Sequence, residues 1–595
     1  MEDVRPDIDE NIEHGEVPDD AQPERSPFRI YTTFAALCLD LFVAALNQTI
    51  ASTTIPSITA DLPGSAAGYT WIGGAYLLAN AAGGPIWARG SDIWGRKPAM
   101  LAALALFAAA TTVVAASADM ATLLCGRGLQ GAAAGGLMQL VTIALSDLLS
   151  LRHRALGLSA LGLVWVVAGT AGPVVGGALA QYASWRWCFW LSLPVCAVTF
   201  FVMLMFLDVH NPRTALAVGL RAIDWLGIAS MLAATLLLLL GLDLGGIVYP
   251  WGSPTIICMV VLGACMVPIF LHIEMSVARF PLIHLAMFRD RSNVATVIVA
   301  FTHSISSFGT EYYLPLYFQA VKQTTPFQSG FLILPLIITC VVVDIVSSAY
   351  MFKFGRYREL IWGGTALLTL GTGFYIAYDA DTSMAAIIGF QIVHGMGMSS
   401  LFQTPLMALQ SSVSQADTAT TTATLGFLRN LGMCLSTVIG GVVFQNSMAS
   451  WRSRLAASGL DEAQLQALSG YGASAHVNMP QHLTDPVQRQ TVIDAFAWSV
   501  RNMFIVYTCI AGVGLLASAF IKQRYMSKEH TETRTGVDNM TDQRKAKAER
   551  RVVVGTEHET NTTRLLHYMC PRETNHWRNL RRAADGLRSF TGEEL

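Results

Sequence analysis

Long apolar stretches separated by short polar turns recur from residue 29 to residue 521. Each is long enough for an α-helix to cross about 30 Å of hydrocarbon, and none has the two-residue alternation of a barrel strand. The pattern predicts an all-α integral membrane protein with fourteen spanning helices. Their approximate ranges are 29–53, 69–88, 98–117, 122–148, 156–181, 188–208, 223–246, 254–274, 293–319, 328–351, 359–378, 383–409, 420–447 and 496–521.

Composition supports this prediction, because 53% of the 595 residues are hydrophobic and 13% are charged, against about 25% charged in soluble domains. The charges concentrate in residues 1–28 and 522–595. A net charge of −2 at pH 7 provides no global basic field for nucleic acid. A soluble enzyme and a nucleic-acid-binding protein are therefore excluded. No cysteine or histidine spacing indicates a metal site, and we expect no metal and no cofactor.

An even number of spans places both termini on one side of the membrane. The positive-inside rule makes that side cytoplasmic, because its loops carry most of the arginines and lysines. They are Arg96, Lys97, Arg152, Arg154, Arg213, Arg221, Arg279, Arg289, Arg291, Lys353, Arg356 and Arg358. The acidic tail 1–28 lacks an apolar stretch and is no signal peptide. The tail 522–595 is expected to be solvated and disordered, with a basic cluster at 544–551 that alternatively contacts anionic lipid.

Four ordered motifs carry a family resemblance. They are LNQTIASTTIP at 46–56, ARGSDIWGRKP at 88–98, LCGRGLQG at 124–131 and GTAGPVVGG at 169–177. These resemble the signature motifs of the major facilitator superfamily, and the span count resembles its fourteen-span drug:proton antiporters. WRWCFW at 185–190, YYLPLYFQ at 312–319 and FLRNLG at 427–432 resemble the fungal toxin and multidrug efflux members.

The resemblance implies the major facilitator fold, with two six-helix halves at 29–208 and 275–521 joined by an inserted helix pair at 209–274. A short internal echo agrees with this division. Gly95-Arg96 follows the second span and Gly355-Arg356 follows the tenth, and both pairs are expected to form tight turns. Parallel repeats of this kind are common in secondary transporters.

The turn after the second span carries Asp92, Gly95, Arg96 and Lys97, which we call the latch. Glycine permits a tight reversal, and a carboxylate near helix ends can lock two helices through charged hydrogen bonds that break when the halves rock. The alternative is positive-inside anchoring, which explains Arg96 and Lys97 but not Asp92.

Two further motifs have both a functional and a structural interpretation. Arg127 lies within a span, where a guanidinium needs a partner or a water-filled cavity, and the resemblance implies a role in proton transfer. The alternative is an arginine bonded to carbonyl groups. The glycine-proline motif of the fifth span is associated with antiport in the family, but it also suits close helix packing alone. Its residues are Gly169, Gly172, Pro173, Gly176 and Gly177.

The family commonly has an aspartate where this chain has Asn47, and an amide carries no proton. Asp40 lies two helical turns earlier on nearly the same face, as a substitute carboxylate or as a structural polar group. Arg127, Glu311 and Asp344 are the other candidates for proton coupling, since ionisable groups within spans are functional candidates. The predicted substrate-cavity residues are Asn47, Gln48, Gln130, His303, Gln403 and Arg429.

The resemblance thus implies a proton-coupled secondary transporter, not an enzyme, that exports an amphipathic toxin, drug or secondary metabolite by alternating access. Its expected partners are a small-molecule substrate, protons and the lipid bilayer, and the expected state is a monomer in the plasma membrane. Two alternatives remain open at this point. One is a siderophore or vacuolar basic amino-acid transporter of the same superfamily, in the second case in the vacuolar membrane. The other is a membrane receptor.

Overall fold

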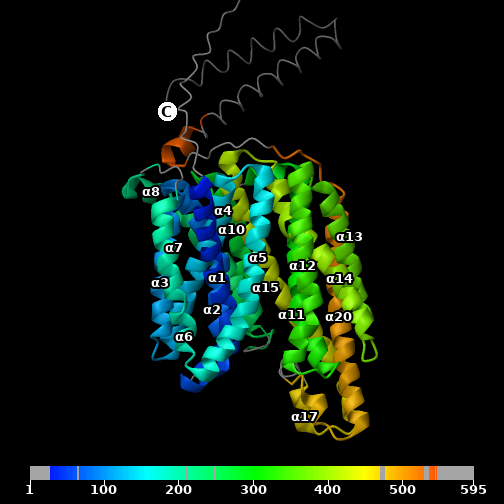
Figure 1. Ribbon diagram of the computed structural model, residues 1–595. Helices are drawn as coiled ribbons and strands as arrows, with labels where there is room; N and C mark the ends of the chain where they lie inside the picture. The colour runs from blue at the N-terminus through cyan, green and yellow to red at the C-terminus, as the bar shows by residue number, and fades with distance from the viewer. Residues whose placement is uncertain are drawn as a thin grey trace, which may run out of the picture.

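The computed structural model describes residues 27–62, 66–207, 212, 214–245, 249–283, 285–468, 476–527, 535–542 and 545. These form a bundle of long, roughly parallel helices (Figure 1). The acidic segment 1–26 and most of the basic cluster at 544–551 lie outside the described residues.

The N-terminal part of the bundle consists of seven helices. They are α1 (Pro27–Asp61), α2 (Ala66–Trp94), α3 (Arg96–Ala115), α4 (Met120–Leu148), α5 (Leu151–Tyr182), α6 (Arg186–Trp190) and α7 (Ser192–Phe206). The sequence predicts one span at 188–208, and the structure divides that region at Leu191, shortly before Pro194. A proline cannot continue the hydrogen-bond pattern of a helix interior.

The region predicted to be the inserted pair consists of α8 (Leu216–Ala222), α9 (Trp225–Leu244) and α10 (Pro254–His272), and α10 is followed by the π-helical turn η1 (Ile273–Val277). Asp224 and Ser253 cap α9 and α10 by accepting from the backbone N–H groups of Gly227 and Ile256, as N-cap side chains do. Helix α9 contacts both α2 and α15, so it lies against both of the halves that the sequence predicts.

The C-terminal part begins with η2 (Leu285–Arg289) and contains the long helices α11 (Arg291–Ala320), α12 (Pro326–Phe354), α13 (Arg358–Phe374), α14 (Met384–Gln410), α15 (Thr418–Ser450) and α20 (Pro486–Ser518). Short turns η3 (Tyr375–Ala377) and η4 (Gln415–Asp417) lie between them. The connection from α15 to α20 holds α16 (Arg452–Ala457), α17 (Glu462–Ala467) and α19 (Met479–His482). Thr325 and Gln328 form a reciprocal capping box at the start of α12.

Twelve helices in the described part of the chain are long and apolar enough to cross a membrane. Helices α2 and α11, with 29 and 30 residues, lie in the same bundle but are not among these twelve. The number fourteen therefore stays a prediction.

Glycines bring α2 and α4 into close contact. A Cβ atom added at Gly83 would overlap the carbonyl of Ala132, and one added at Gly131 or Gly135 would overlap the backbone of Tyr76 or Asn80. Small residues allow helix backbones in membranes to approach in this way.

We call the end of the bundle where α2, α4, α12, α14 and α20 finish the tail end, at the top of Figure 1. The halves are joined here by hydrogen bonds. Gln139 on α4 donates to the carbonyl of Thr422 (2.9 Å), and Gln410 on α14 donates to Ser146 Oγ (3.0 Å). The tail end is therefore closed between the halves.

Candidate functional site

Arg96 is the centre of a buried polar cluster at the tail end. Its Nε donates to Asp147 Oδ2 at 2.8 Å, and its Nη1 donates to Asp92 Oδ1 at 2.5 Å. Nη1 also donates to Ser91 Oγ at 2.6 Å. The side chain of Arg96 is 2% exposed, so this guanidinium joins the end of α2, the start of α3 and the end of α4 by charged hydrogen bonds away from water.

The turn that positions Arg96 depends on Gly95. Its φ of 97° and ψ of 159° are allowed for glycine and rarely adopted by other residues. Gly355, after α12, has a φ of 67°, so each of the two predicted Gly-Arg turns contains a glycine with a positive φ. Lys97, the fourth latch residue, is half-buried in the first turn of α3.

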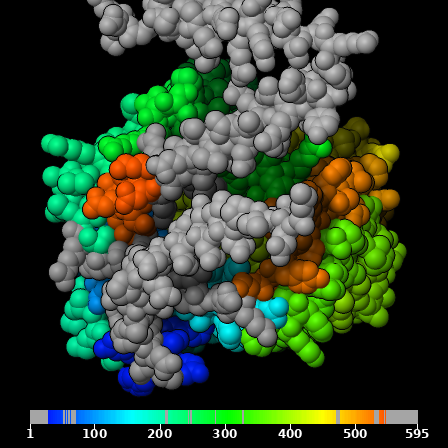
Figure 2. Space-filling view, turned by 90° about the horizontal axis from the view of Figure 1, so that it is seen from above, coloured from blue at the N-terminus to red at the C-terminus, as the bar shows by residue number. Residues whose placement is uncertain are grey.

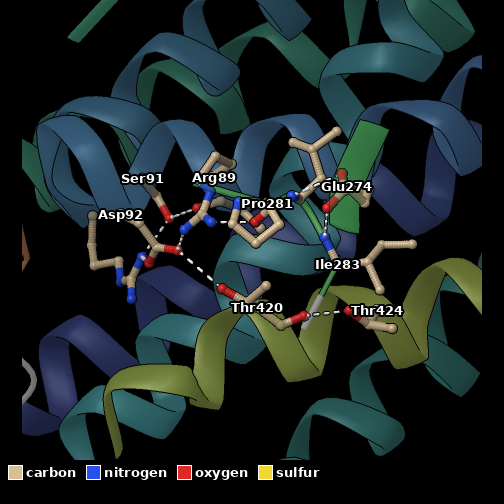
Figure 3. A network of polar contacts seen from close by, with 11 residues as sticks. Arg89, Ser91, Asp92, Glu274, Pro281, Ile283, Thr420 and Thr424 are labelled. Atoms are coloured by element: carbon tan, nitrogen blue, oxygen red, sulfur yellow. Dashed lines mark hydrogen bonds and ion pairs between the residues drawn. The ribbon is translucent and has the colours of Figure 1, made fainter. Parts of the chain in front are cut away.

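Asp92 also contacts α15 and, through Arg89, the segment that follows η1 (Figure 3). Its Oδ2 accepts from Thr420 Oγ1 on α15 and from Arg89 Nη1, both at 3.4 Å. Arg89 Nη2 donates to the carbonyl of Pro281, in the segment that follows the inserted pair.

The backbone next to Pro281 is held by Glu274 of η1. One carboxylate oxygen accepts from the N–H of Leu282 at 3.0 Å, and the other accepts from the N–H of Ile283 at 3.4 Å. The network in Figure 3 therefore links the predicted latch to α15 and to the end of the inserted pair.

A second set of contacts between the halves was not predicted from the sequence. Arg154 on α5 donates to Gln410 Oε1 (3.3 Å) and to Gln415 Oε1 (2.8 Å). The sequence predicts for Arg154 only a contribution to the positive-inside orientation. Asp147 was not predicted either, although it lies within an apolar segment, where its charge was a signal that could have indicated it.

Arg127 lies in a closed polar network inside the N-terminal half. Its Nε donates to the carbonyl of Ile72 at 3.0 Å, and Nη1 donates to Gln130 Oε1 at 2.7 Å. Its guanidinium stacks over the ring of Tyr76, 4.4 Å from the centroid. Gln130 in turn donates to Asn47 Oδ1 at 3.1 Å. All three predicted polar residues are fully buried, so they contact one another and carbonyl groups in this conformation.

Asn47 also donates to Ser192 Oγ on α7 at 2.7 Å. Asp40, two turns earlier on α1, is completely buried, and neither carboxyl oxygen has a hydrogen-bond partner among the described residues. It lies near Cys196 of α7. The structure therefore does not bring Asp40 into the hydrogen-bond network of Asn47. Gln48 is half-buried on the neighbouring face.

Within the predicted antiporter motif the glycines differ in their surroundings. A Cβ atom at Gly172 would overlap Thr49 Oγ1 and lie 3.0 Å from the backbone nitrogen of Ile50 on α1. A Cβ atom at Gly169 or Gly177 would meet nothing within 4 Å. The carbonyl of Gly176 accepts from Cys188 Sγ at 3.8 Å. Pro173 lies within α5. Gly172 is thus where this motif brings α5 against α1.

The two other predicted carboxylates lie on the C-terminal half. Asp344 on α12 is 9% exposed and faces Gly162 and Ser159 of α5 across the boundary between the halves. Glu311 on α11 has an exposed side chain. The thiol of Cys340 on α12 lies within the range of electrostatic interaction with both carboxylates. Glu311 and Asp344 therefore both lie near Cys340.

Two predicted cavity residues hold α14 through its backbone. His303 Nε2 bonds to the carbonyl of Met398 at 2.8 Å, and Arg429 Nη2 donates to the carbonyl of Phe402 at 2.7 Å. Arg429 has no carboxylate partner among the described residues. Gln403 donates across the boundary to the carbonyl of Leu158 at 3.3 Å. Within the described residues no three His, Cys, Asp or Glu side chains form a metal site.

A bundle of apolar helices, in two parts held together by a polar cluster at one end, is typical of a multi-pass membrane transporter. Comparison with known proteins gives the family. The model of the Major Facilitator Superfamily matches residues 37–437, and the chain belongs to this family. It is therefore a secondary transporter and not an enzyme.

Individual relatives agree with this assignment. "MFS-type transporter ppz2" of Metarhizium majus is 40% identical over 86% of this chain and 88% of its own length. "Efflux pump dotC" of Dothistroma septosporum is 40% identical over 84% and 86%. The solved proton:xylose symporter XylE has a TM-score of 0.51 at 15% identity, over 86% of this chain and 97% of its own, which shows the fold.

Proposed function

We propose that this protein exports amphipathic organic compounds, such as toxins, drugs or secondary metabolites, in exchange for protons. The tail end is cytoplasmic, with both termini on that side, and the protein acts as a monomer in the plasma membrane. The name "Efflux pump" of a relative at 40% identity supports export. The arginines and lysines of the loops at the tail end support this orientation.

The observation that carries proton coupling is the environment of Asp40. A carboxylate that is buried without a hydrogen-bond partner is costly when ionised, and binding a proton removes that cost. The carboxyl group of Asp40 has no partner among the described residues. A proton taken up from outside therefore stabilises the arrangement in which the tail end is closed. Its release to the cytoplasm favours the arrangement in which the tail end is open.

Glu311 and Asp344 are the second candidates for the coupling group. Asp344 lies on the boundary between α5 and α12. A relative movement of the halves therefore changes the surroundings of its charge. Arg127 sets the electrostatic environment of α1 from its contact with Gln130. The cargo contacts six polar residues once their hydrogen bonds to the protein open. They are Asn47, Gln48, Gln130, His303, Gln403 and Arg429.

Efflux from a pump-deficient yeast host tests this function. Cells that express the full chain are loaded with a panel of fluorescent amphipathic compounds, and efflux is followed with and without a protonophore. We expect efflux of at least one compound, lost with the protonophore and lost in Asp40→Asn. Asp381→Asn, at an exposed loop carboxylate, is the matched control and retains efflux.

Other outcomes contradict specific parts of the proposed function. Protonophore-sensitive efflux that persists in Asp40→Asn but is lost in Glu311→Gln or Asp344→Asn moves the coupling group to the C-terminal half. No efflux of any compound by a protein that reaches the cell surface contradicts broad export. In that case siderophore uptake is measured next, or basic amino-acid uptake if the protein resides in the vacuolar membrane.

A further inference from the structure

Arg429 is a cation inside the bundle that has no opposite charge beside it. It lies in α15, one of the helices long and apolar enough to cross a membrane, and none of the ion pairs among the described residues includes it. Its Nε is buried and has no hydrogen-bond partner in the described part of the chain, and its Nη2 donates only to a carbonyl group, that of Phe402. A guanidinium within a span needs a partner or a water-filled space, so the charge of Arg429 is incompletely compensated in this arrangement.

The depth of Arg429 in the membrane follows from its position along α15. Thr420 and Thr422, at the start of this helix, contact the latch and α4 at the tail end. At 1.5 Å per residue, Arg429 lies roughly 10–13 Å further along the helix axis. Secondary transporters bind their substrates near the middle of the bilayer, at the interface between two repeats. Arg429 therefore lies at the depth of a substrate site.

The direction in which Arg429 points follows from its neighbours on the same helix. Gly426 faces α4, because an added Cβ atom would overlap the side chain of Gln139. Gly432 faces α11, because an added Cβ atom would lie 3.1 Å from Cβ of Ser304. Positions three residues apart differ by about 60° around a helix, so Arg429 lies between these two directions. It is therefore directed at the boundary between the N-terminal and C-terminal parts of the bundle.

The surface around Arg429 is partly accessible and partly apolar. Arg429 is half-buried, and its guanidinium carbon lies 5.9 Å from the centroid of the Phe402 ring, which is 40% exposed. The tail end is closed in this arrangement. Figure 2 looks onto that end and shows cyan residues of the N-terminal part directly beside green and orange residues of the C-terminal part. A ligand that reaches the boundary between the two parts therefore meets a cation next to an aromatic ring.

Two other arginines deep in the described bundle differ from Arg429. Arg96 is paired with Asp92 and Asp147, so its charge is compensated within the protein. Arg127 is completely buried and donates to two backbone carbonyl groups, so no ligand touches it in this arrangement. Of these three cations, Arg429 is the one that combines a missing opposite charge with an accessible surface.

We propose that the cargo carries an anionic group, such as a carboxylate, which forms an ion pair with Arg429 while the apolar body of the cargo packs on the ring of Phe402. The inference rests on the proposed function, because it takes the amphipathic cargo of that proposal and assigns its charge. A guanidinium presents its N–H groups in one plane and binds a carboxylate through two parallel hydrogen bonds. Such a cargo supplies the opposite charge that Arg429 lacks, whereas a neutral cargo leaves the guanidinium uncompensated.

Ligand binding to the purified full chain in lipid nanodiscs tests this proposal without transport. The probes are dansyl-leucine, naphthylacetic acid and lauric acid, and each acid is compared with its own neutral carboxamide. Affinities are measured by microscale thermophoresis. Sodium acetate, which has the carboxylate but no apolar body, is added as a competitor at the concentration of the tightest acid. It distinguishes a site for amphipathic acids from a site for small anions.

Three variants assign the preference to one residue. Arg429→Gln removes the charge but keeps an N–H group that can donate to the carbonyl of Phe402, and Arg429→Lys keeps the charge without the planar guanidinium. Arg221→Gln makes the same charge change at an exposed arginine of α8 and is the matched control. We expect at least one acid to bind the wild type about tenfold or more tightly than its carboxamide. Arg429→Gln abolishes this difference, Arg429→Lys keeps part of it and Arg221→Gln keeps all of it.

Equal affinities of acids and carboxamides for the wild type overturn the proposal, as does the absence of binding by every acid. An acid preference that survives in Arg429→Gln, or competition by acetate, also overturns it. If Arg429→Gln does not fold, an undiminished preference in Arg429→Lys has the same meaning.

The two proposals can fail separately. Protonophore-sensitive efflux of neutral compounds without any acid preference in binding leaves the export proposal intact and overturns the anionic cargo. A clear acid preference that depends on Arg429, in a chain that exports nothing, supports the anionic ligand and contradicts export.

Discussion

Asp147 is the partner of Arg96 that most directly tests the latch, because it lies on α4 while Asp92 lies on α2. In Asp147→Asn the Nε of a buried guanidinium loses its ionic partner. We expect the free energy of unfolding to fall by about 1–3 kcal/mol. Thermal unfolding in detergent, followed by tryptophan fluorescence, measures the change. Asp381→Asn is the control, and equal melting of both variants would contradict a stabilising role for Asp147.

Individual site residues were predictable where their chemistry was unusual for a membrane span. Arg127 is a charged group within a predicted span, which needs partners, and the structure supplies them. Asp92 was recognised instead because positive-inside anchoring does not explain a carboxylate in the turn after the second span. Thr420 and Gln410 carry no such signal. Their contacts with Asp92 and Ser146 join positions 328 and 264 residues apart, and no local pattern specifies which distant polar groups meet.

Helix α5 offers a matched pair of glycines for testing the predicted antiporter motif. Gly172→Ala places a methyl group against Thr49 and Ile50 of α1, whereas Gly169→Ala places one in open space. Overpacking of a closed contact costs about 1–3 kcal/mol, so we expect Gly172→Ala to lower both the melting temperature and the efflux rate. Gly169→Ala retains both.

The measurement is thermal unfolding together with efflux in the same host. If Gly169→Ala impairs efflux as strongly as Gly172→Ala without lowering stability, the motif acts by a route other than the α1–α5 contact. The helix pattern predicted that α1 and α5 exist. It did not predict which glycine touches α1, because that depends on the rotation of each helix about its own axis.

For the molecule as a whole, hydrophobic runs were sufficient to predict a helical bundle, because a span must satisfy its own backbone groups in lipid. The family fold followed from four short motifs. The packing of Val537 and Met540 against the cluster of Ile93, Ala222 and Phe280 did not follow. A polar composition predicts a solvated tail, and two apolar side chains such as Val537 and Met540 are too few to alter that prediction.

Arg154 tests whether the closed tail end is a two-state contact between the halves. It joins α5 to Gln410 and Gln415, so Arg154→Ala removes bonds that exist only while this end is closed. A hydrogen bond to a charged group contributes about 1.5–3 kcal/mol, and every 1.4 kcal/mol is about tenfold in an equilibrium constant. We expect the open population to rise about tenfold or more.

Pulsed electron–electron double resonance measures that population as a new, longer distance between two spin labels. The labels are placed at Ala217 on α8 and Glu359 on α13, which are both exposed near the tail end. Arg221→Ala is the control, since Arg221 is an exposed arginine on α8 of the same charge. A distance distribution in Arg154→Ala identical to that of Arg221→Ala would contradict a role for Arg154 in holding this end closed.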